Sequence, residues 1–131
     1  GDGWDGPTEA NTDAALIEGA YYCSGFSADD TSEAVQTFLS DYNTAYGEAP
    51  NMFSATTYDA AAILCDALKV AEDAGLPAGT DEYKAAVIEA IGNTDGEYVT
   101  GHFTYDDNNN PVKDAIIIQI VDGKYTFNCK F

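Results

Sequence analysis

Residues 53–74 read FSATTYDAAAILCDALKVAEDA and carry the strongest helical pattern in the chain. Within this stretch, apolar side chains recur at spacings of three and four, at Ala60, Ile63, Leu64, Ala67, Leu68 and Ala71. This spacing places them on one side of a helix, and Thr56 or Thr57 can cap its start. Many of them are alanine, which favours close packing against a sheet or another helix. We therefore predict a long helix over 54–74, with Phe53 on the loop before it.

Two further long helices are predicted on either side of this one. The first, near 31–47, has one apolar stripe and a possible cap at Thr31 or Ser32. The second, near 80–92, begins with Thr80 as its cap and has two acidic residues in its first turn. A shorter helical stretch covers residues 8–17.

Segments rich in strand-forming residues occur before and after the helices. We predict strands near 20–26, 98–105, 113–121 and 124–128. The Asp122-Gly123 pair joins the last two as a hairpin, because this dipeptide accepts the positive backbone dihedrals of a two-residue turn. The chain of 131 residues is long enough for one core, and the fold class expected from this order of elements is mixed α/β.

The charge of the chain is strongly one-sided. It has 23 Asp plus Glu, only five Lys and no Arg, for a net charge of −18. Nucleic-acid binding requires a basic surface that this chain lacks, and an anionic membrane would repel it. Phosphate-rich substrates would lack the Arg side chains that usually hold them. With 45% apolar residues, wholesale disorder is also disfavoured.

The three cysteines are Cys23, Cys65 and Cys129, and no two of them have the spacing of a redox or zinc motif. One disulfide with a free thiol is one interpretation. Three reduced, mostly buried thiols is the favoured one, because free cysteine often packs as a small apolar residue.

The longest apolar runs are too short to cross a membrane, and the N-terminus lacks the pattern of a signal peptide. The chain is accordingly expected to be cytosolic, already processed or cut from a longer protein.

Asp106, Asn108 and Asn110 have the spacing of the first ligands of a calcium-binding loop. Pro111 stands where such a loop needs glycine, and Ile117 stands where it needs glutamate. We therefore expect a plain polar turn between two strands, and no metal or other cofactor.

An enzymatic site finds little support in the sequence. His102 is the only imidazole, and its surroundings predict a half-exposed histidine on a strand. No catalytic residue is proposed, and the protein is not expected to be an enzyme.

Two aromatic residues, Trp4 and Phe53, fall in segments with Gly, Pro or Asn beside helix starts. They could form the walls of a small-ligand site or simply pack against the core, and the residues alone slightly favour packing.

Four motifs together resemble the C-terminal part of the branched-chain amino-acid type of solute-binding protein, which serves ABC transporters. They occur in the family's order and spacing and cover nearly the whole chain. They are Gly1-Asp2-Gly3-Trp4-Asp5; Glu18-Gly19-Ala20-Tyr21-Tyr22; Tyr46-Gly47-Glu48-Ala49-Pro50 followed by Tyr58-Asp59-Ala60; and Gly101 through Asp106 followed by Asn110–Lys113 and Asp122–Lys124.

The resemblance implies part of a type I periplasmic-binding fold. Such proteins have two Rossmann-like α/β lobes joined by crossovers, with the ligand in the cleft between them. Residues 1–26 would be a strand, loop and crossover of the second lobe, and residues 27–112 would belong to the first lobe. Residues 113–131 would be the C-terminal β tail with its hairpin.

The resemblance also implies a partial ligand site. Asp2 matches the acidic residue that receives the ligand's ammonium group. Phe53 matches an aromatic residue against the ligand side chain, and Trp4 is a second wall. Tyr58 is expected to pack beneath the cleft. The contacts to the ligand's carboxylate would lie outside this chain.

The function implied is extracytoplasmic binding of amino acids or similar solutes for an ABC transporter, by a periplasmic protein or a cell-surface lipoprotein. The partners would be the small-molecule solute and the transporter permease, and the isolated chain would self-associate. Two alternatives stay open: a ligand-sensing ectodomain of a signalling receptor, and an autonomous interaction domain without solute binding. The solute itself is left open.

Overall fold

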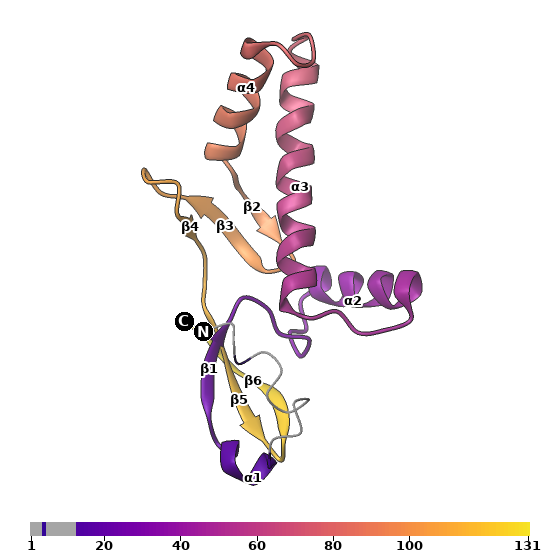
Figure 1. The fold of residues 1–131 in the computed structure, drawn as a ribbon, viewed down its shortest axis with the longest axis vertical. Coiled ribbons are helices and arrows are strands. Elements are labelled where there is room, and N and C mark those ends of the chain that lie inside the picture. Colours follow the sequence, from indigo (N-terminus) through magenta and orange to yellow (C-terminus); the bar gives the residue numbers. More distant parts are fainter. Residues whose placement is uncertain (1–3, 5–12) are drawn as a thin grey trace. The chain divides into compact units, whose positions relative to one another are not determined.

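The computed structural model describes Trp4 and residues 13–131 (Figure 1). Its elements are α1 (Ala14–Ile17), β1 (Tyr21–Ser24), α2 (Glu33–Tyr46), α3 (Met52–Asp73), α4 (Asp81–Gly92), β2 (Asp95–Tyr98), β3 (Gly101–Tyr105), β4 (Pro111–Val112), β5 (Ile116–Val121) and β6 (Lys124–Lys130). This order confirms the mixed α/β class. The chain forms two compact units: one contains the residues up to Thr56 together with Asp114–Phe131, and the other contains Thr57–Lys113.

The first unit contains an antiparallel sheet with strand order β1-β5-β6. Side chains alternate between its two faces, so Tyr22, Ile116 and Ile118 are buried together on one face. Tyr125 and Phe127 of β6 pack against this cluster, and the rings of Tyr22 and Tyr125 meet edge to face at 5.9 Å. This sheet pairs β1, from the N-terminal part of the chain, with β5 and β6 from its C-terminal part.

The predicted hairpin between β5 and β6 is confirmed. Asp122 and Gly123 have φ values of 52° and 70°, which are the left-handed conformations that a tight two-residue turn requires. The carboxylate of Glu18 accepts hydrogen bonds from the Asp122 N–H at 2.9 Å and the Gly123 N–H at 3.2 Å. The turn is therefore stabilised by the distant Glu18 side chain as well as by its own backbone conformation.

Helix α2 agrees with the helix predicted near 31–47. It buries Val35 and Phe38, and the Phe38 ring contacts Phe26 edge to face at 6.0 Å. Ser32 occupies the N-cap position without a side-chain capping bond. Gly47 ends the helix with φ 74°, and its N–H donates to the Asn43 carbonyl at 2.8 Å.

Helix α3 begins earlier than the sequence predicted. Asn51, rather than Thr56 or Thr57, caps it, because the Asn51 Oδ1 accepts a hydrogen bond from the Ser54 N–H at 3.0 Å. Thr56 lies inside the helix and donates its hydroxyl to the Met52 carbonyl at 3.0 Å. Phe53 is consequently a helical residue and not a loop residue.

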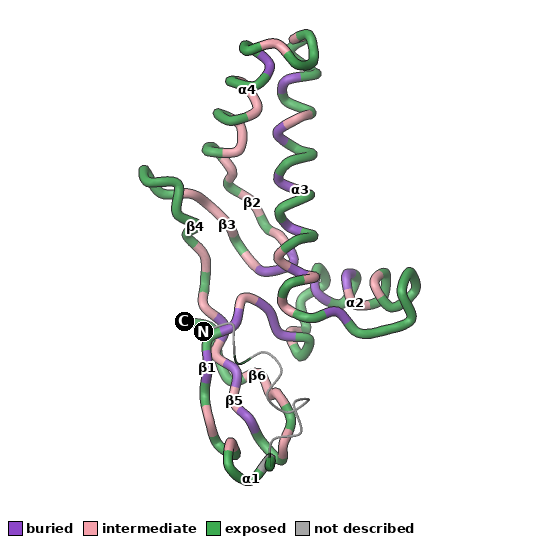
Figure 2. Tube along the Cα trace, in the orientation of Figure 1, coloured by how far each residue is buried: buried purple, intermediate pink, exposed green. Residues whose placement is uncertain are grey.

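The buried side of α3 also differs from the predicted stripe. Residues at a constant spacing of four are buried: Ala55, Asp59, Ile63, Ala67 and Ala71 (Figure 2). Ala60 and Leu64, which the sequence placed inward, are exposed, and Leu64 is 45% exposed. One of these buried residues is Asp59, and a pattern of apolar residues cannot predict a buried carboxylate.

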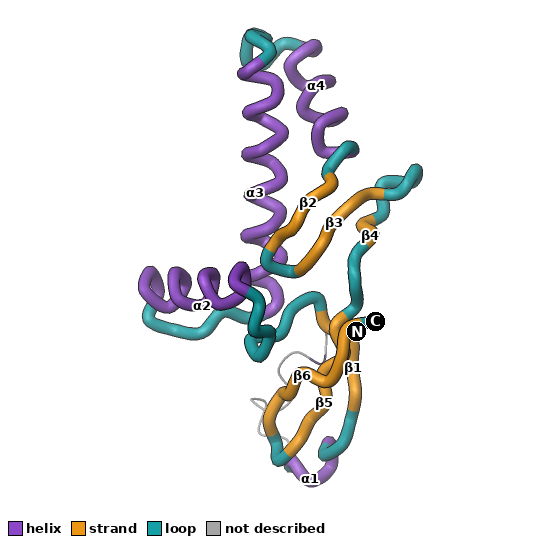
Figure 3. Tube along the Cα trace, turned by 180° about the vertical axis from the view of Figure 1, so that it is seen from behind, coloured by secondary structure: helices purple, strands orange, loops and turns teal. Residues whose placement is uncertain are grey.

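The second unit contains most of α3, helix α4 and an antiparallel sheet with strand order β2-β3-β4 (Figure 3). The helix predicted near 80–92 is confirmed, and Thr80 accepts the capping bond from the Tyr83 N–H at 3.2 Å. The single strand predicted over 98–105 is wrong. Two strands, β2 and β3, pair here around a tight turn at Val99 and Thr100.

Several other boundaries differ from those predicted. The strand predicted over 124–128 continues to Lys130. The strand predicted over 20–26 stops at Ser24, where the Ser24 hydroxyl bonds to the Phe26 carbonyl at 2.9 Å and bends the chain. The strand predicted over 113–121 begins at Ile116. The helical stretch predicted over 8–17 is confirmed at Ala14–Ile17, and its residues 8–12 lie outside the described residues. Within the described residues, no helix is both long and apolar enough to cross a membrane.

Candidate functional site

The structure describes two of the three predicted ligand-contact residues, Trp4 and Phe53. Asp2 lies outside the described residues. Phe53 is the second residue of α3 and is 54% exposed, while Trp4 is 42% exposed. Among the ring contacts of the described residues, none joins Trp4 to Phe53. Both aromatic side chains are therefore available to a ligand but do not form a wall by direct stacking.

A cavity of about 220 Å³ lies in the first unit beside the start of α3. Ser27 and Asp29 of the β1–α2 loop line it on one side, and Asn51 and Met52 line it on another. Aromatic rings from Tyr22, Phe26 and Tyr125 complete most of the apolar lining. The lining of the cavity is mixed, with polar groups from Ser27, Asp29 and Asn51 beside the apolar side chains.

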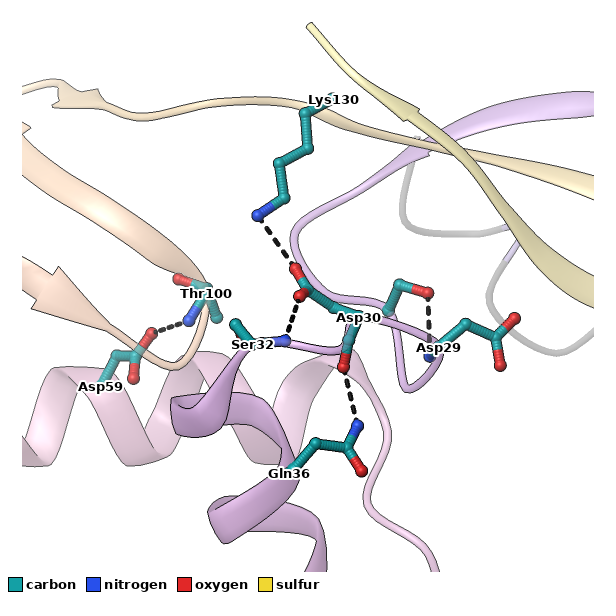
Figure 4. A network of polar contacts seen from close by, with 8 residues as sticks. Asp29, Asp30, Ser32, Gln36, Asp59, Thr100 and Lys130 are labelled. Carbon is teal, nitrogen blue, oxygen red and sulfur yellow. Dashed lines mark hydrogen bonds and ion pairs between the residues drawn. The ribbon is translucent and has the colours of Figure 1, made fainter.

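The β1–α2 loop beside this cavity is fixed by two neighbouring aspartates (Figure 4). The Asp29 carboxylate accepts a hydrogen bond from the Phe127 N–H of β6 at 3.3 Å. The Asp30 carboxylate accepts one from the Ser32 N–H at 2.8 Å and forms an ion pair with Lys130 of β6 at 2.9 Å. These contacts attach the loop to the C-terminal strand.

The charge state of Asp30 follows from these contacts. Its side chain is only 13% exposed, and this burial by itself raises the pKa. The hydrogen bonds from Lys130 and Ser32, together with the positive charge of Lys130, outweigh burial and hold the pKa of Asp30 below its usual range. The carboxylate is therefore ionised at neutral pH and keeps its attachment to Lys130.

Asp59, from the Tyr58-Asp59-Ala60 motif, is a buried structural residue that the sequence analysis missed. It is 4% exposed, and its carboxylate accepts hydrogen bonds from the Val99 N–H at 3.0 Å and the Thr100 N–H at 2.8 Å. These two donors form the β2–β3 turn, which lies beside α3 (Figures 1 and 3). The only signal in the sequence was an acid within an otherwise apolar helix face.

The segment from Asp106 to Asn110 is a polar turn between two strands, as predicted. The Asp106 carboxylate accepts hydrogen bonds from the Asn108 N–H and the Asn110 N–H, both at 2.8 Å, and Asn109 has φ 60°. Hydrogen bonds from the Asn110 side chain and then its backbone hold the pKa of Asp106 below its usual range. Within the described part of the chain, no group of three or more His, Cys, Asp or Glu is placed to hold a metal ion.

His102 has the environment that the sequence predicted. It lies on β3 with its side chain 53% exposed, between Asp95 at 3.2 Å and Glu97 at 3.1 Å on the neighbouring strand. Both imidazole nitrogens therefore have carboxylate partners, and the ring forms part of a cross-strand surface pair.

The expectation of mostly buried thiols is wrong. Cys23, Cys65 and Cys129 are free and exposed. Cys23 and Cys129 both lie opposite Ile117 in the register of the first sheet. Cys23 alternates along β1 with the buried Tyr22 and Ser24, so the pleat directs it to the outer face. A register irregularity between Ile117 and Ile118 separates Cys129 from Phe127, which packs on the buried face.

Comparison with known proteins identifies the family of the chain. A sequence model of the family described as "Periplasmic binding protein" matches residues 3–124. The chain belongs to the periplasmic binding protein family. The resemblance described from its motifs is thereby confirmed. No curated protein matches the chain.

Solved structures of periplasmic binding proteins share the fold. A leucine-binding protein, LivK, from Thermotoga maritima has 22% identity and a TM-score of 0.77, over 98% of this chain and 35% of that one. A solute-binding protein from R. palustris in complex with benzoate has 19% identity and a TM-score of 0.76, over 96% and 33%. LivJ from Streptococcus pneumoniae, in complex with isoleucine, has 27% identity and a TM-score of 0.66, over 84% and 30%.

The chain therefore spans about a third of the length of the solved periplasmic binding proteins that it matches. Its fold is a partial type I periplasmic-binding fold, as the sequence analysis expected.

Proposed function

We propose that this chain is the C-terminal part of an extracytoplasmic substrate-binding protein that supplies amino acids or similar small solutes to an ABC transporter. The observation that carries the proposal is the family match over residues 3–124. It is supported by the fold shared with LivJ, whose structure holds isoleucine, and with a solute-binding protein that holds benzoate. No catalytic residue is part of the proposal.

The division of the chain between two lobes is part of the same proposal. Residues 1–26 would contribute a strand, loop and crossover of the second lobe, residues 27–112 would belong to the first lobe, and residues 113–131 would form the β tail. The pairing of β1 with β5 supports grouping the two ends of the chain. The compact units of the structure divide the chain at Thr56 and Lys113.

Three residues would contact the solute. Asp2 would receive the ammonium group through a charge-assisted hydrogen bond. Phe53 would cover the apolar side chain of the solute, with Trp4 as a second wall. The exposure of Phe53 at the first turn of α3 supports this role, because the side chain is free of the core and available to a ligand.

The proposed location and partners are supported by the family match. The complete protein would lie in the periplasm or be anchored to the cell surface as a lipoprotein, and it would deliver its solute to the transporter permease. The isolated chain would self-associate, because the outer strands of its two sheets are paired on one side only among the described residues and could pair with a second copy. Sedimentation that finds only monomer at high concentration would contradict self-association.

The test is calorimetric titration with a panel of amino acids and aromatic acids, carried out on the chain and on the longer protein that would contain it. Asp2→Asn in the longer protein should weaken binding by on the order of thirtyfold or more, because the ammonium would be buried without its counter-charge. Phe53→Ala should weaken binding less, and more for large apolar solutes than for small ones.

The matched control is Phe131→Ala, which removes an aromatic side chain that is 92% exposed and should leave affinity unchanged. An unaltered affinity in Asp2→Asn would remove Asp2 from the site. Tight binding by the isolated chain would contradict the view that it carries only part of the cleft. Failure of the longer protein to bind any solute of the panel would contradict the proposed function itself.

A further inference from the structure

The cavity of about 220 Å³ in the first unit is separate from the residues proposed to contact the solute. Neither Trp4 nor Phe53 is among its lining residues, and Asp2 lies outside the described residues. A volume of roughly 150 Å³ is enough for benzene in a protein cavity, and pockets for drug-sized ligands begin at roughly 300 Å³. The cavity therefore has room for one small organic molecule.

Three aromatic side chains, those of Tyr22, Phe26 and Tyr125, line this cavity. Tyr22 and Phe26 are buried, and the rings of Tyr22 and Tyr125 meet edge to face with their centroids 5.9 Å apart. The face of an aromatic ring carries partial negative charge and attracts a cation that lies within about 6 Å of the ring centroid. The aromatic lining therefore favours a positively charged ligand over a negatively charged one.

Among the described residues, Asp29 is the only charged one that lines the cavity. Its carboxylate accepts one hydrogen bond, from the Phe127 N–H at 3.3 Å, and a carboxylate has about four acceptor sites. Lys130 is not among the lining residues and is paired with Asp30 at 2.9 Å (Figure 4). An anionic ligand would meet Asp29 without a basic side chain to balance it, whereas an ammonium group would gain an oppositely charged partner.

The start of α3 forms another part of the lining, through Asn51 and Met52. The N-terminus of a helix carries partial positive charge, which opposes a cation. Part of this charge is already compensated, because Asn51 Oδ1 accepts a hydrogen bond from the Ser54 N–H at 3.0 Å. The ammonium group is therefore expected beside Asp29, and the apolar part of the ligand is expected against Met52 and the aromatic rings.

We propose that this cavity binds a small organic ammonium ion that carries no carboxylate. The net charge of −18 raises the concentration of cations near the protein and supports such binding. Asp29 is exposed, so its ion pair with the ligand contributes only modestly, as does each cation–π contact. A dissociation constant on the order of 1 mM is expected. This inference does not depend on the proposed function.

The experiment compares choline with the neutral alcohol in which a tert-butyl group replaces its trimethylammonium group. The two molecules have nearly the same shape and differ in charge. NMR titration of the chain at about 150 mM sodium chloride measures both affinities and locates the site. Choline should shift the amide signals of Ser27, Asp29 and Met52, and it should bind at least about tenfold more tightly than the alcohol.

Two variants of the chain test the role of Asp29. Asp29→Asn removes the charge but keeps an oxygen that can accept the Phe127 N–H bond. It should weaken choline binding by about five- to tenfold and leave the affinity for the alcohol unchanged. Asp107→Asn is the matched control, because it removes an exposed carboxylate that does not line the cavity. This control should change neither affinity.

Three outcomes would overturn the inference. The first is choline binding no tighter than that of the alcohol to the unaltered chain. The second is a choline response that is spread over the acidic surface and absent from Ser27, Asp29 and Met52, which would indicate only general attraction of cations. The third is an equal loss of choline affinity in Asp29→Asn and Asp107→Asn.

Discussion

Individual carboxylates in this protein hold backbone turns. Glu18, Asp59 and Asp106 each accept two backbone N–H hydrogen bonds from a turn or loop. A turn leaves N–H groups without strand or helix partners, and an ionised acceptor satisfies them more strongly than a neutral one. Some of the acidic residues behind the −18 charge therefore have a structural role.

The first prediction concerns Asp59. Asp59→Asn should lower the free energy of unfolding by about 1.5–3 kcal/mol, because the carboxamide keeps one acceptor oxygen but turns an NH2 donor toward the other backbone N–H within a buried site. Urea unfolding at neutral pH measures the difference. Asp66→Asn, an exposed carboxylate on the same helix, is the control and should change stability little. Equal stability of the two variants would mean that the Val99 and Thr100 N–H groups find other acceptors.

The second prediction is a pH dependence at Asp30. Its folded-state pKa lies below the unfolded value, so the ionised carboxylate stabilises the folded protein. This contribution is fully present above the unfolded pKa of about 3.9 and is lost as the pH falls through the lowered folded pKa. Asp30→Asn should accordingly reduce stability at pH values above about 4 and have progressively less effect below that.

Chemical unfolding of both proteins across this acid range measures the effect. Asp107→Asn, an exposed carboxylate, serves as the control. A deficit in Asp30→Asn that stays constant down to the lowest pH would show that its cause is lost packing and not ionisation.

Among the elements, the β5–β6 hairpin could be predicted from the sequence and the β2–β3 hairpin could not. The first is defined locally, because Asp122 and Gly123 themselves adopt the left-handed dihedrals of the turn. The second depends on Asp59, which lies 40 residues before Val99. The local pattern therefore predicted one hairpin, but for the other it predicted one strand over 98–105, which includes β3 and leaves out most of β2.

The third prediction tests the local turn. Gly123→Ala should lower the free energy of unfolding by about 1–2 kcal/mol, because a side chain disfavours the left-handed conformation that Gly123 adopts. Gly92→Ala is the matched control: Gly92 ends α4, and a Cβ there would meet no atom within 4 Å. That change should be neutral or stabilising by up to about 1 kcal/mol. Thermal unfolding of both variants distinguishes a dihedral requirement from a general sensitivity to alanine.

At the scale of the whole molecule, the net charge of −18 opposes compactness. Ion pairs offset little of it: those between Lys69 and Asp73 and between Lys84 and Asp81 are exposed, and such pairs contribute about 0–1 kcal/mol each. Repulsion among the remaining carboxylates should therefore destabilise the folded protein, and added salt should weaken this repulsion.

The fourth prediction is a rise in melting temperature with sodium chloride, from about 10 mM, where charges interact over about 30 Å, to about 1 M, where they interact over about 3 Å. The combined variant Asp41→Asn, Glu72→Gln and Asp107→Asn removes three exposed charges and should show a smaller rise. A melting temperature that is independent of salt, or equally dependent in both proteins, would contradict a role for net repulsion.

The sequence by itself determined the elements whose causes are local. The three long helices follow from apolar spacing and end signals such as Thr80 and Gly47, and the β5–β6 turn follows from Asp122-Gly123. The family could be recognised for a related reason, because its motifs are short and fixed in order, and a match over residues 3–124 confirms it.

Only the tertiary structure decided the features that depend on residues distant in the chain. Asp59 reaches the β2–β3 turn across 40 positions, and Lys130 reaches Asp30 across the first unit. The outward direction of Cys23 was decided by which sheet face is covered, and the position of Met52 beside Gly25 by how the β1–α2 loop meets α3. The physical reason is that periodicity and capping act over a few residues, whereas a hydrogen bond to a distant turn exists only after the chain has folded.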